Sequence, residues 1–306
     1  MKIGTKNRKT EVPDSSSFQE PSQRKGRRLK HIAFLPSFIT LINGACGFIA
    51  ILFASDAYFA MAGFLILLAM VADVLDGRVA RLTRTTSSFG GQLDSLSDAV
   101  SFGVAPAFLM IKLVEYHLGQ LGFEDLGLPM LLGRVIILSA VLYAMCAVVR
   151  LARFNVENEE DEAAHMNFAG LPSPAAAGVV VSIVIFHQQI LPRLIDVTTE
   201  MFHIATVAAL PLITILTGIL MVSRVRYPHV ANQLLRSKKS LGFLLLIFAT
   251  GLLIVWNIQF ALLAGFGGFA LFGVLRWIVS LFRKPPSAKK NPVPDNPEQA
   301  SQSGGV

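Results

Sequence analysis

The stretch "FAMAGFLILLAMVADVLDGRVARLTRTTSSFGGQLDSLSD", residues 59–98, decides the fold. Its first half is apolar, and a helix needs about 20 apolar residues to cross a bilayer. Its second half carries four aspartates among several arginines: Asp73, Asp76, Asp94 and Asp98. Acidic side chains at the end of a membrane segment are costly, and they usually serve a function. The stretch therefore predicts both a membrane fold and a functional site.

The composition of the 306-residue chain is typical of a membrane protein. Hydrophobic residues make up 53% of the chain and charged residues 15%, whereas soluble proteins carry about 25% charged residues. Backbone groups in lipid must be satisfied internally, which favours helices. We therefore expect an all-α fold, a polytopic membrane helical bundle. Cys46 and Cys146 both lie in apolar segments, and we expect them to be buried free thiols.

Eight transmembrane helices are expected from the apolar blocks. They cover about residues 36–55, 57–81, 93–114, 129–153, 174–191, 201–222, 241–256 and 260–282. Residues 33–282 would then form the membrane domain. The basic residues 1–32 are expected to be a disordered cytoplasmic arm, and the Pro-rich residues 283–306 a disordered cytoplasmic tail.

The arginines and lysines predict the orientation of this bundle. They gather in the two tails and in the loops after the second, fourth and sixth expected spans, while the other loops are acidic or nearly neutral. Cytoplasmic loops carry such an excess of positive charge. We therefore expect both termini and the aspartate cluster to lie in the cytoplasm, with the protein in the inner membrane if the cell is bacterial. The net charge of +7 is explained by topology, so no nucleic-acid partner is expected.

The spacing of the aspartates predicts two acidic helix faces. Asp73 and Asp76 lie three residues apart, and Asp94 and Asp98 lie four apart, so each pair shares one side of a helix. Gly90 and Gly91 are expected to break the chain between them, which lets the two faces meet. Carboxylates that converge repel one another unless a cation neutralises them. Oxygen ligands without His or Cys favour Mg²⁺ or Mn²⁺.

Two other interpretations of the cluster stay open. Single aspartates at helix ends can simply reach water, although four in this register make that explanation weak. The acids would also suit the ion site of a cation transporter. That alternative leaves the glycine, alanine and arginine between them unexplained.

The spacing D-x2-D-G-x2-A-R-x8-G-x3-D-x3-D is complete from Asp73 to Asp98, and it resembles the motif of the CDP-alcohol phosphotransferase family. The resemblance implies a six-helix core, here with two helices added, and a homodimer. It also implies transfer of a phosphatidyl group from a CDP-linked lipid to an alcohol, with release of CMP and with two divalent metal ions. The residue roles it implies are metal binding by Asp73, Asp76, Asp94 and Asp98, base catalysis by Asp98, and contact with the CDP-lipid by Gly77, Arg81 and Ser87.

A second stretch, "LPSFITLINGACGF" (residues 35–48), is similar to the P-x-x-x-T entry of the same family. That similarity implies that Ser37 and Thr40 line the nucleotide site. On their own, Thr40 and Asn43 fit equally well as polar residues that pack between membrane helices.

The acceptor alcohol is indicated by a finer resemblance. "LDSLSDAVSFGVAPA" (residues 93–107), "RLARFNV" (150–156), "FAGLPSPAAA" (168–177) and "LMVSRVRYP" (220–228) resemble the phosphatidylserine synthase branch of the family. The implied substrates are CDP-diacylglycerol and L-serine. Arg150, Arg153 and Asn155 are expected to bind the acceptor or a phosphate, although both arginines also fit as positive charges that anchor a span. Glycerol 3-phosphate, inositol phosphate and choline stay open as alternative acceptors for the same reaction.

Overall fold

The computed structural model describes residues 23–83, 87–120, 129–160, 170–190, 192, 199–225, 227 and 257–282. These residues are almost entirely helical, and no β-strand occurs among them. The elements are α1 (Gln23–Ser55), α2 (Phe59–Thr83), α3 (Ser88–Asp98), the π-helix η1 (Ala99–Val104), α4 (Ala105–Gln120), α5 (Pro129–Glu160), α6 (Ser173–Gln189), α8 (Thr199–Val222) and α11 (Ile258–Phe282). The predicted helical bundle is confirmed.

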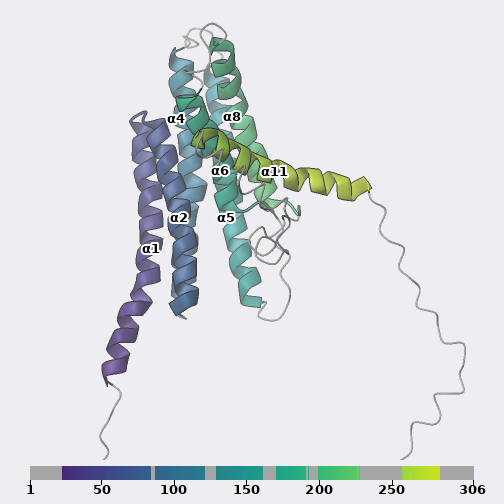
Figure 1. The fold of residues 1–306 in the computed structure, drawn as a ribbon. Helices are drawn as coiled ribbons and strands as arrows, with labels where there is room; N and C mark the ends of the chain where they lie inside the picture. Colours follow the sequence, from purple (N-terminus) through teal and green to yellow (C-terminus); the bar gives the residue numbers. More distant parts are fainter. Residues whose placement is uncertain are drawn as a thin grey trace, which may run out of the picture.

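The bundle helices run roughly side by side, as Figure 1 shows. Helix α1 packs on α2 and α3, α5 packs on α8, and α6 contacts α2, α8 and α11. The chain of α3, η1 and α4 is continuous and acts as one long segment. Among the described residues, six segments are long and apolar enough to cross a membrane: Leu35–Ser55, Phe59–Thr83, Ser88–Gly119, Leu132–Val156, Ile204–Val222 and Ile258–Val279.

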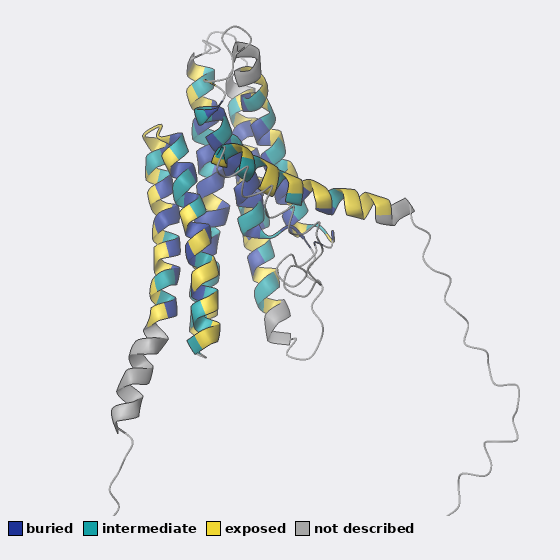
Figure 2. Cartoon of the chain, in the orientation of Figure 1, coloured by how far each residue is buried: buried dark blue, intermediate teal, exposed yellow. Residues whose placement is uncertain are grey.

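Helix α6 forms the centre of the core. It is the most deeply buried of the drawn helices, shown mostly in dark blue in Figure 2, and its valines Val180, Val181 and Val184 are almost fully enclosed. Its 17 residues span about 26 Å, slightly less than the roughly 30 Å of a bilayer core. It coincides with the fifth expected span, and it is surrounded by protein more than by lipid.

The outer helices expose large apolar side chains, among them Phe48, Leu68 and Leu138. In a soluble protein such surfaces would mark interaction sites or cause aggregation. Here they lie on helices of membrane length, where lipid would cover them. Cys46 is buried as expected, whereas Cys146 is only partly buried, and both are free thiols.

Three expectations differ from the structure or lie outside it. Helix α1 begins at Gln23, so residues 23–32 are helical, in contrast to the disorder predicted for the whole of 1–32. Helix α11 runs across the bundle and projects from it (Figure 1), although its position in the sequence matches the eighth expected span. The seventh expected span (241–256) and the tails 1–22 and 283–306 lie outside the described residues. The count of eight spans therefore stays a prediction.

Candidate active site

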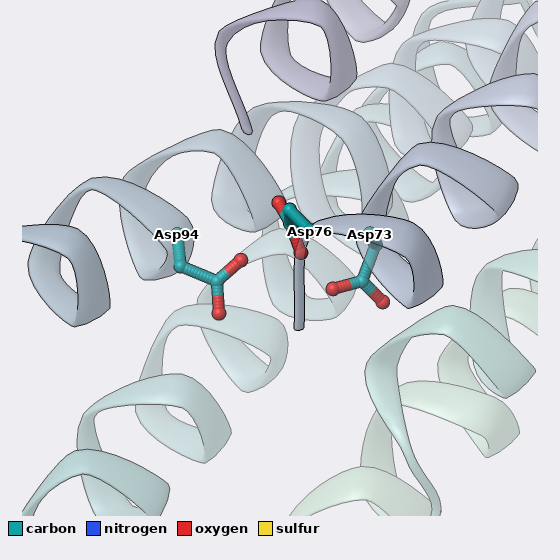
Figure 3. Close-up of side chains that lie close together, drawn as sticks. All are labelled: Asp73, Asp76 and Asp94. Carbon is teal, nitrogen blue, oxygen red and sulfur yellow. The ribbon is translucent and has the colours of Figure 1, made fainter. Parts of the chain in front are cut away.

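Three aspartates from two helices converge at one end of the bundle. Asp73 and Asp76 come from α2 and Asp94 comes from α3, and one carboxylate oxygen of each lies within 4.8 Å of the others. Figure 3 shows the three side chains pointing toward a common space. The two helix faces predicted from the aspartate spacing therefore do meet.

The surroundings of these carboxylates suit a hard cation. Asp76 Oδ2 and Asp94 Oδ1 are buried, and neither has a hydrogen-bond partner among the described residues. A buried carboxylate oxygen without a partner is costly, and a bound cation would remove that cost. The group contains only carboxylates, with no histidine or cysteine, which favours ions of the Mg²⁺ or Mn²⁺ kind.

The fourth aspartate has a different environment. Asp98 follows Asp94 by one helical turn and is only 7% exposed. Its Oδ1 accepts a hydrogen bond of 2.9 Å from Asn43 Nδ2, and it does not belong to the group of three. It still lies close enough to Asp73 and Asp94 to interact with them electrostatically. Its role as a metal ligand stays a prediction.

A cavity of about 340 Å³ opens beside the aspartates. All five residues expected to contact the CDP-lipid line it, together with two of the aspartates. The full lining is Pro36, Ser37, Thr40, Asp76, Gly77, Ala80, Arg81, Ser87, Gly90, Gly91, Asp94, Phe154 and Asn155. Two stretches far apart in sequence, the start of the apolar part of α1 and the aspartate motif, thus form one site.

The start of α3 lines this cavity. Its structure differs from the prediction for the two glycines there. Gly90 and Gly91 do not break the chain; they lie in the first turn of α3, which begins at Ser88. Ser87 is the N-cap, and its Oγ accepts a hydrogen bond of 3.0 Å from the Gly90 N–H. Gly91 instead leaves space in the cavity lining, since a Cβ there would meet no atom within 4 Å.

The three residues expected to bind the acceptor have different surroundings in the structure. Arg150 Nη1 donates a hydrogen bond of 2.9 Å to Ser173 Oγ at the start of α6, and its guanidinium interacts electrostatically with Asp73. Asn155 lines the cavity and accepts a hydrogen bond of 3.0 Å from Ser95 Oγ. Arg153 is exposed and lies outside this lining.

The loop that carries Ser173 is fixed to the end of α8. Gly170 N–H donates to the Val225 carbonyl (2.8 Å) and Leu171 N–H donates to the Leu220 carbonyl (2.9 Å). Gly170 has φ +96°, and a Cβ there would collide with the Met221 carbonyl, so glycine is required. This turn places Ser173 where it meets Arg150.

Sequence reasoning missed two kinds of residue here. Phe154 lines the cavity although nothing in its type suggests a site; its only signal is its place between Arg153 and Asn155. For Asn43 the sequence does not choose between a site role and a packing role, and the structure puts it against Asp98.

Comparison with known proteins agrees with this geometry. The family model described as CDP-alcohol phosphatidyltransferase matches residues 33–225, the part of the chain that builds the cavity. The chain belongs to the CDP-alcohol phosphatidyltransferase family. Six segments among its described residues are long and apolar enough to cross a membrane, so this family member is an integral membrane protein. Dependence on divalent metal is general in the family.

Several relatives within the family are similar over most of their length. A CDP-diacylglycerol–serine O-phosphatidyltransferase of Helicobacter pylori (strain J99) is 33% identical over 79% of this chain and 90% of its own. One of the same name from Methanocaldococcus jannaschii is 32% identical over 82% of this chain and 97% of its own. An archaetidylserine synthase of Methanothermobacter thermautotrophicus is 31% identical over 67% of this chain and 73% of its own.

Proposed function

We propose that this protein transfers the phosphatidyl group of CDP-diacylglycerol to L-serine, giving phosphatidylserine and CMP. The observation that carries the proposal is the single cavity beside three converged aspartates, which joins all five expected donor contacts. The names of the relatives support serine as the acceptor, because the lipid part differs between phosphatidylserine and archaetidylserine while serine is common to both.

The donor would lie with its nucleotide and pyrophosphate in the cavity and its acyl chains in the bilayer. Ser37, Thr40 and Ser87 offer hydroxyl groups for hydrogen bonds to the nucleotide or phosphates. Arg81 supplies a positive charge for the phosphate oxygens. Gly77 leaves room beside it, because a Cβ on Gly77 would have Arg81 Nη2, at 3.9 Å, as its nearest neighbour.

Asp73, Asp76 and Asp94 would hold divalent metal, with Asp98 as a further ligand if two ions bind. Bound Mg²⁺ or Mn²⁺ would neutralise the charge that develops on the pyrophosphate as CMP leaves. The orphaned buried oxygens of Asp76 and Asp94 support this assignment. The chain's own contribution is to keep four carboxylates at one end of two helices.

Asp98 is proposed to accept the proton of the serine hydroxyl, which then attacks the phosphorus that bears the diacylglycerol. The new phosphoester bond forms as the bond between that phosphorus and CMP breaks. Arg150, through its position near Asp73, and Asn155, in the cavity wall, are proposed to hold the serine carboxylate or a donor phosphate. Positioning and charge would supply most of the rate. A homodimer in which both termini and the active site face the cytoplasm completes the proposal.

The acceptor is tested by purifying the protein and measuring CMP release from CDP-diacylglycerol with Mg²⁺ or Mn²⁺. Serine, glycerol 3-phosphate, inositol phosphate and choline are supplied in parallel reactions, and the lipid product is identified by mass. We expect CMP release that depends on serine. Release with glycerol 3-phosphate and none with serine would overturn the serine assignment and leave the reaction class intact. Metal-dependent cation flux without CMP release would instead favour a transporter.

A further inference from the structure

Helix α1 closely approaches the segment on both sides of Asp98, at Ser97 and Ser101. A Cβ on Gly47 would lie 2.6 Å from Ser101 Cα, and a Cβ on Gly44 would lie 3.1 Å from Ser97 Oγ. Real Cβ atoms essentially never lie within 3.0 Å of such neighbours, so the 2.6 Å between Gly47 and Ser101 Cα leaves no room for a side chain at position 47. The two segments therefore touch through their backbones at these glycines, which fixes the position of α1 relative to Asp98.

This contact brings Asn43 against the catalytic end of α3. The Asn43 side chain is fully buried. Its Nδ2 donates the only hydrogen bond to the Asp98 carboxylate among the described residues, at 2.9 Å. The backbone of Asn43 is held as well, because Ser101 Oγ donates to its carbonyl oxygen at 2.8 Å. Ser101 lies in η1, three residues after Asp98. Asn43 is thus fixed from the same segment that carries its partner.

The amide is satisfied on one side only. Asn43 Oδ1 is buried and has no hydrogen-bond partner among the described residues. A residue that served only to pack α1 against η1 would fit better as an apolar side chain, since an orphaned buried oxygen is destabilising. Cys46, one turn further along α1, packs in that apolar way. The hydrogen bond that Asn43 Nδ2 donates to Asp98 therefore outweighs the free-energy cost of burying Oδ1 without a partner.

We propose that Asn43 is a positioning residue for phosphatidyl transfer: its amide holds the Asp98 carboxylate by Oδ1, which leaves Oδ2 to take the proton of the acceptor hydroxyl. The inference rests on the proposed role of Asp98 as the base. Asn43 touches neither substrate; it acts by restricting the carboxylate to one rotamer and one orientation. Groups that orient a reacting carboxylate or metal ligand in this way typically matter about 10- to 100-fold.

The test replaces Asn43 with leucine, which has a similar volume and no donor. Steady-state CMP release is measured for the purified full chain, with each substrate varied in turn. We expect Asn43→Leu to lower kcat about 10- to 100-fold and to leave the KM for CDP-diacylglycerol within about twofold. Cys46→Ala, a packing change on the same helix without a polar partner, is the matched control and is expected to retain the wild-type kcat.

The outcomes separate this inference from the proposed function. Serine and glycerol 3-phosphate are both supplied, so a wrong acceptor assignment appears in the wild type, and the effect of Asn43→Leu is read on whichever alcohol reacts. An unchanged kcat in Asn43→Leu, or a rise in KM alone, overturns the positioning role. If Asn43→Leu fails to give a monodisperse protein, Ser101→Ala takes its place. It frees the Asn43 backbone, and an unchanged kcat in that variant overturns the inference too.

Discussion

Asp73 is the residue whose loss tests the metal site most directly, because it is one of three grouped carboxylates and lies outside the cavity wall. Asp73→Asn keeps the size of the side chain and removes its charge. We expect turnover at limiting Mg²⁺ or Mn²⁺ to fall at least about 100-fold, with the same amount of protein in the membrane fraction. Activity equal to wild type at low metal would contradict a ligand role for Asp73.

Asp98→Asn tests the base separately from the metal. The amide keeps the shape of the carboxylate but cannot take a proton, so we expect kcat to fall about 10²- to 10⁴-fold. Binding of CDP-diacylglycerol, measured without an acceptor, is expected to stay close to wild type. Near-normal turnover in this variant would show that another group accepts the proton.

The sequence predicts site residues that share one helix face, and it does not predict contacts between residues on different helices. The aspartates could be found because three or four residues along a helix place side chains on one face. The bond from Asn43 to Asp98 joins residues 55 positions apart, and no local pattern predicts that register between α1 and α3. Phe154 was missed for a related reason: an apolar residue can line a cavity or a lipid-facing surface.

Gly47 in α1 and Gly77 in α2 are predicted to be needed for different reasons, Gly47 for helix packing and Gly77 for binding the donor. Gly47→Ala forces a methyl group into the Ser101 backbone, and overpacking of this kind costs about 1–3 kcal/mol. Gly77→Ala meets no protein atom closer than 3.9 Å but enters the cavity. We expect Gly47→Ala to lower the thermal midpoint in detergent, and Gly77→Ala to raise the KM for CDP-diacylglycerol about 10-fold or more at an unchanged midpoint.

The comparison is informative because each variant is the other's control. Both add one methyl group to a helical glycine. A fall in the thermal midpoint for Gly77→Ala, or a purely kinetic effect of Gly47→Ala, would contradict the assignment of one glycine to packing and the other to the donor site.

At the element scale, the apolar blocks predict helices and their approximate ends, and the turn chemistry is harder to read. The sequence predicts Gly90 and Gly91 to be breakers, because glycine is a poor helix former. They lie in the first turn of α3, where the Ser87 cap supports them. The π-helix after Asp98 has no pattern in the sequence, since its residues read as an ordinary apolar run.

Helix α2 gives a prediction about the whole molecule: if it crosses the membrane, Asp56, just before the helix, and Leu82, near its end, lie on opposite sides. Its 25 residues span about 38 Å, more than the bilayer core. In a variant with Cys46 and Cys146 replaced by alanine, a membrane-impermeant thiol reagent should label Asp56→Cys from outside intact cells. It should label Leu82→Cys only in inside-out vesicles. Labelling of both from one side would rule out α2 as a span, and the reverse pattern would invert the orientation.

For the whole molecule, charge and hydropathy predict a helical bundle, but they do not predict the arrangement of its helices or which of them are enclosed by protein. The valines of α6 look no different in sequence from those of lipid-facing helices, and only packing shows that α6 is enclosed. Helix α11 is equally apolar and lies across the bundle (Figure 1), with Leu271, Phe272 and Leu275 exposed. Hydropathy measures preference for an apolar environment, and protein and lipid satisfy that preference alike.

The π-helix η1 makes the length of its segment as critical as its chemistry. Its hydrogen bonds skip one residue more than those of an α-helix, as in the bond from Ala105 N–H to the Val100 carbonyl. Each residue turns an α-helix by about 100°, so this extra residue sets the phase between the aspartates of α3 and the buried face of α4. Deleting one residue from Ala99–Val104 would leave the hydropathy of the segment and the spacing of the four aspartates intact. If Leu109 and Leu113 stay in the core, the deletion would rotate α3 relative to α4 and turn Asp94 and Asp98 away from α2.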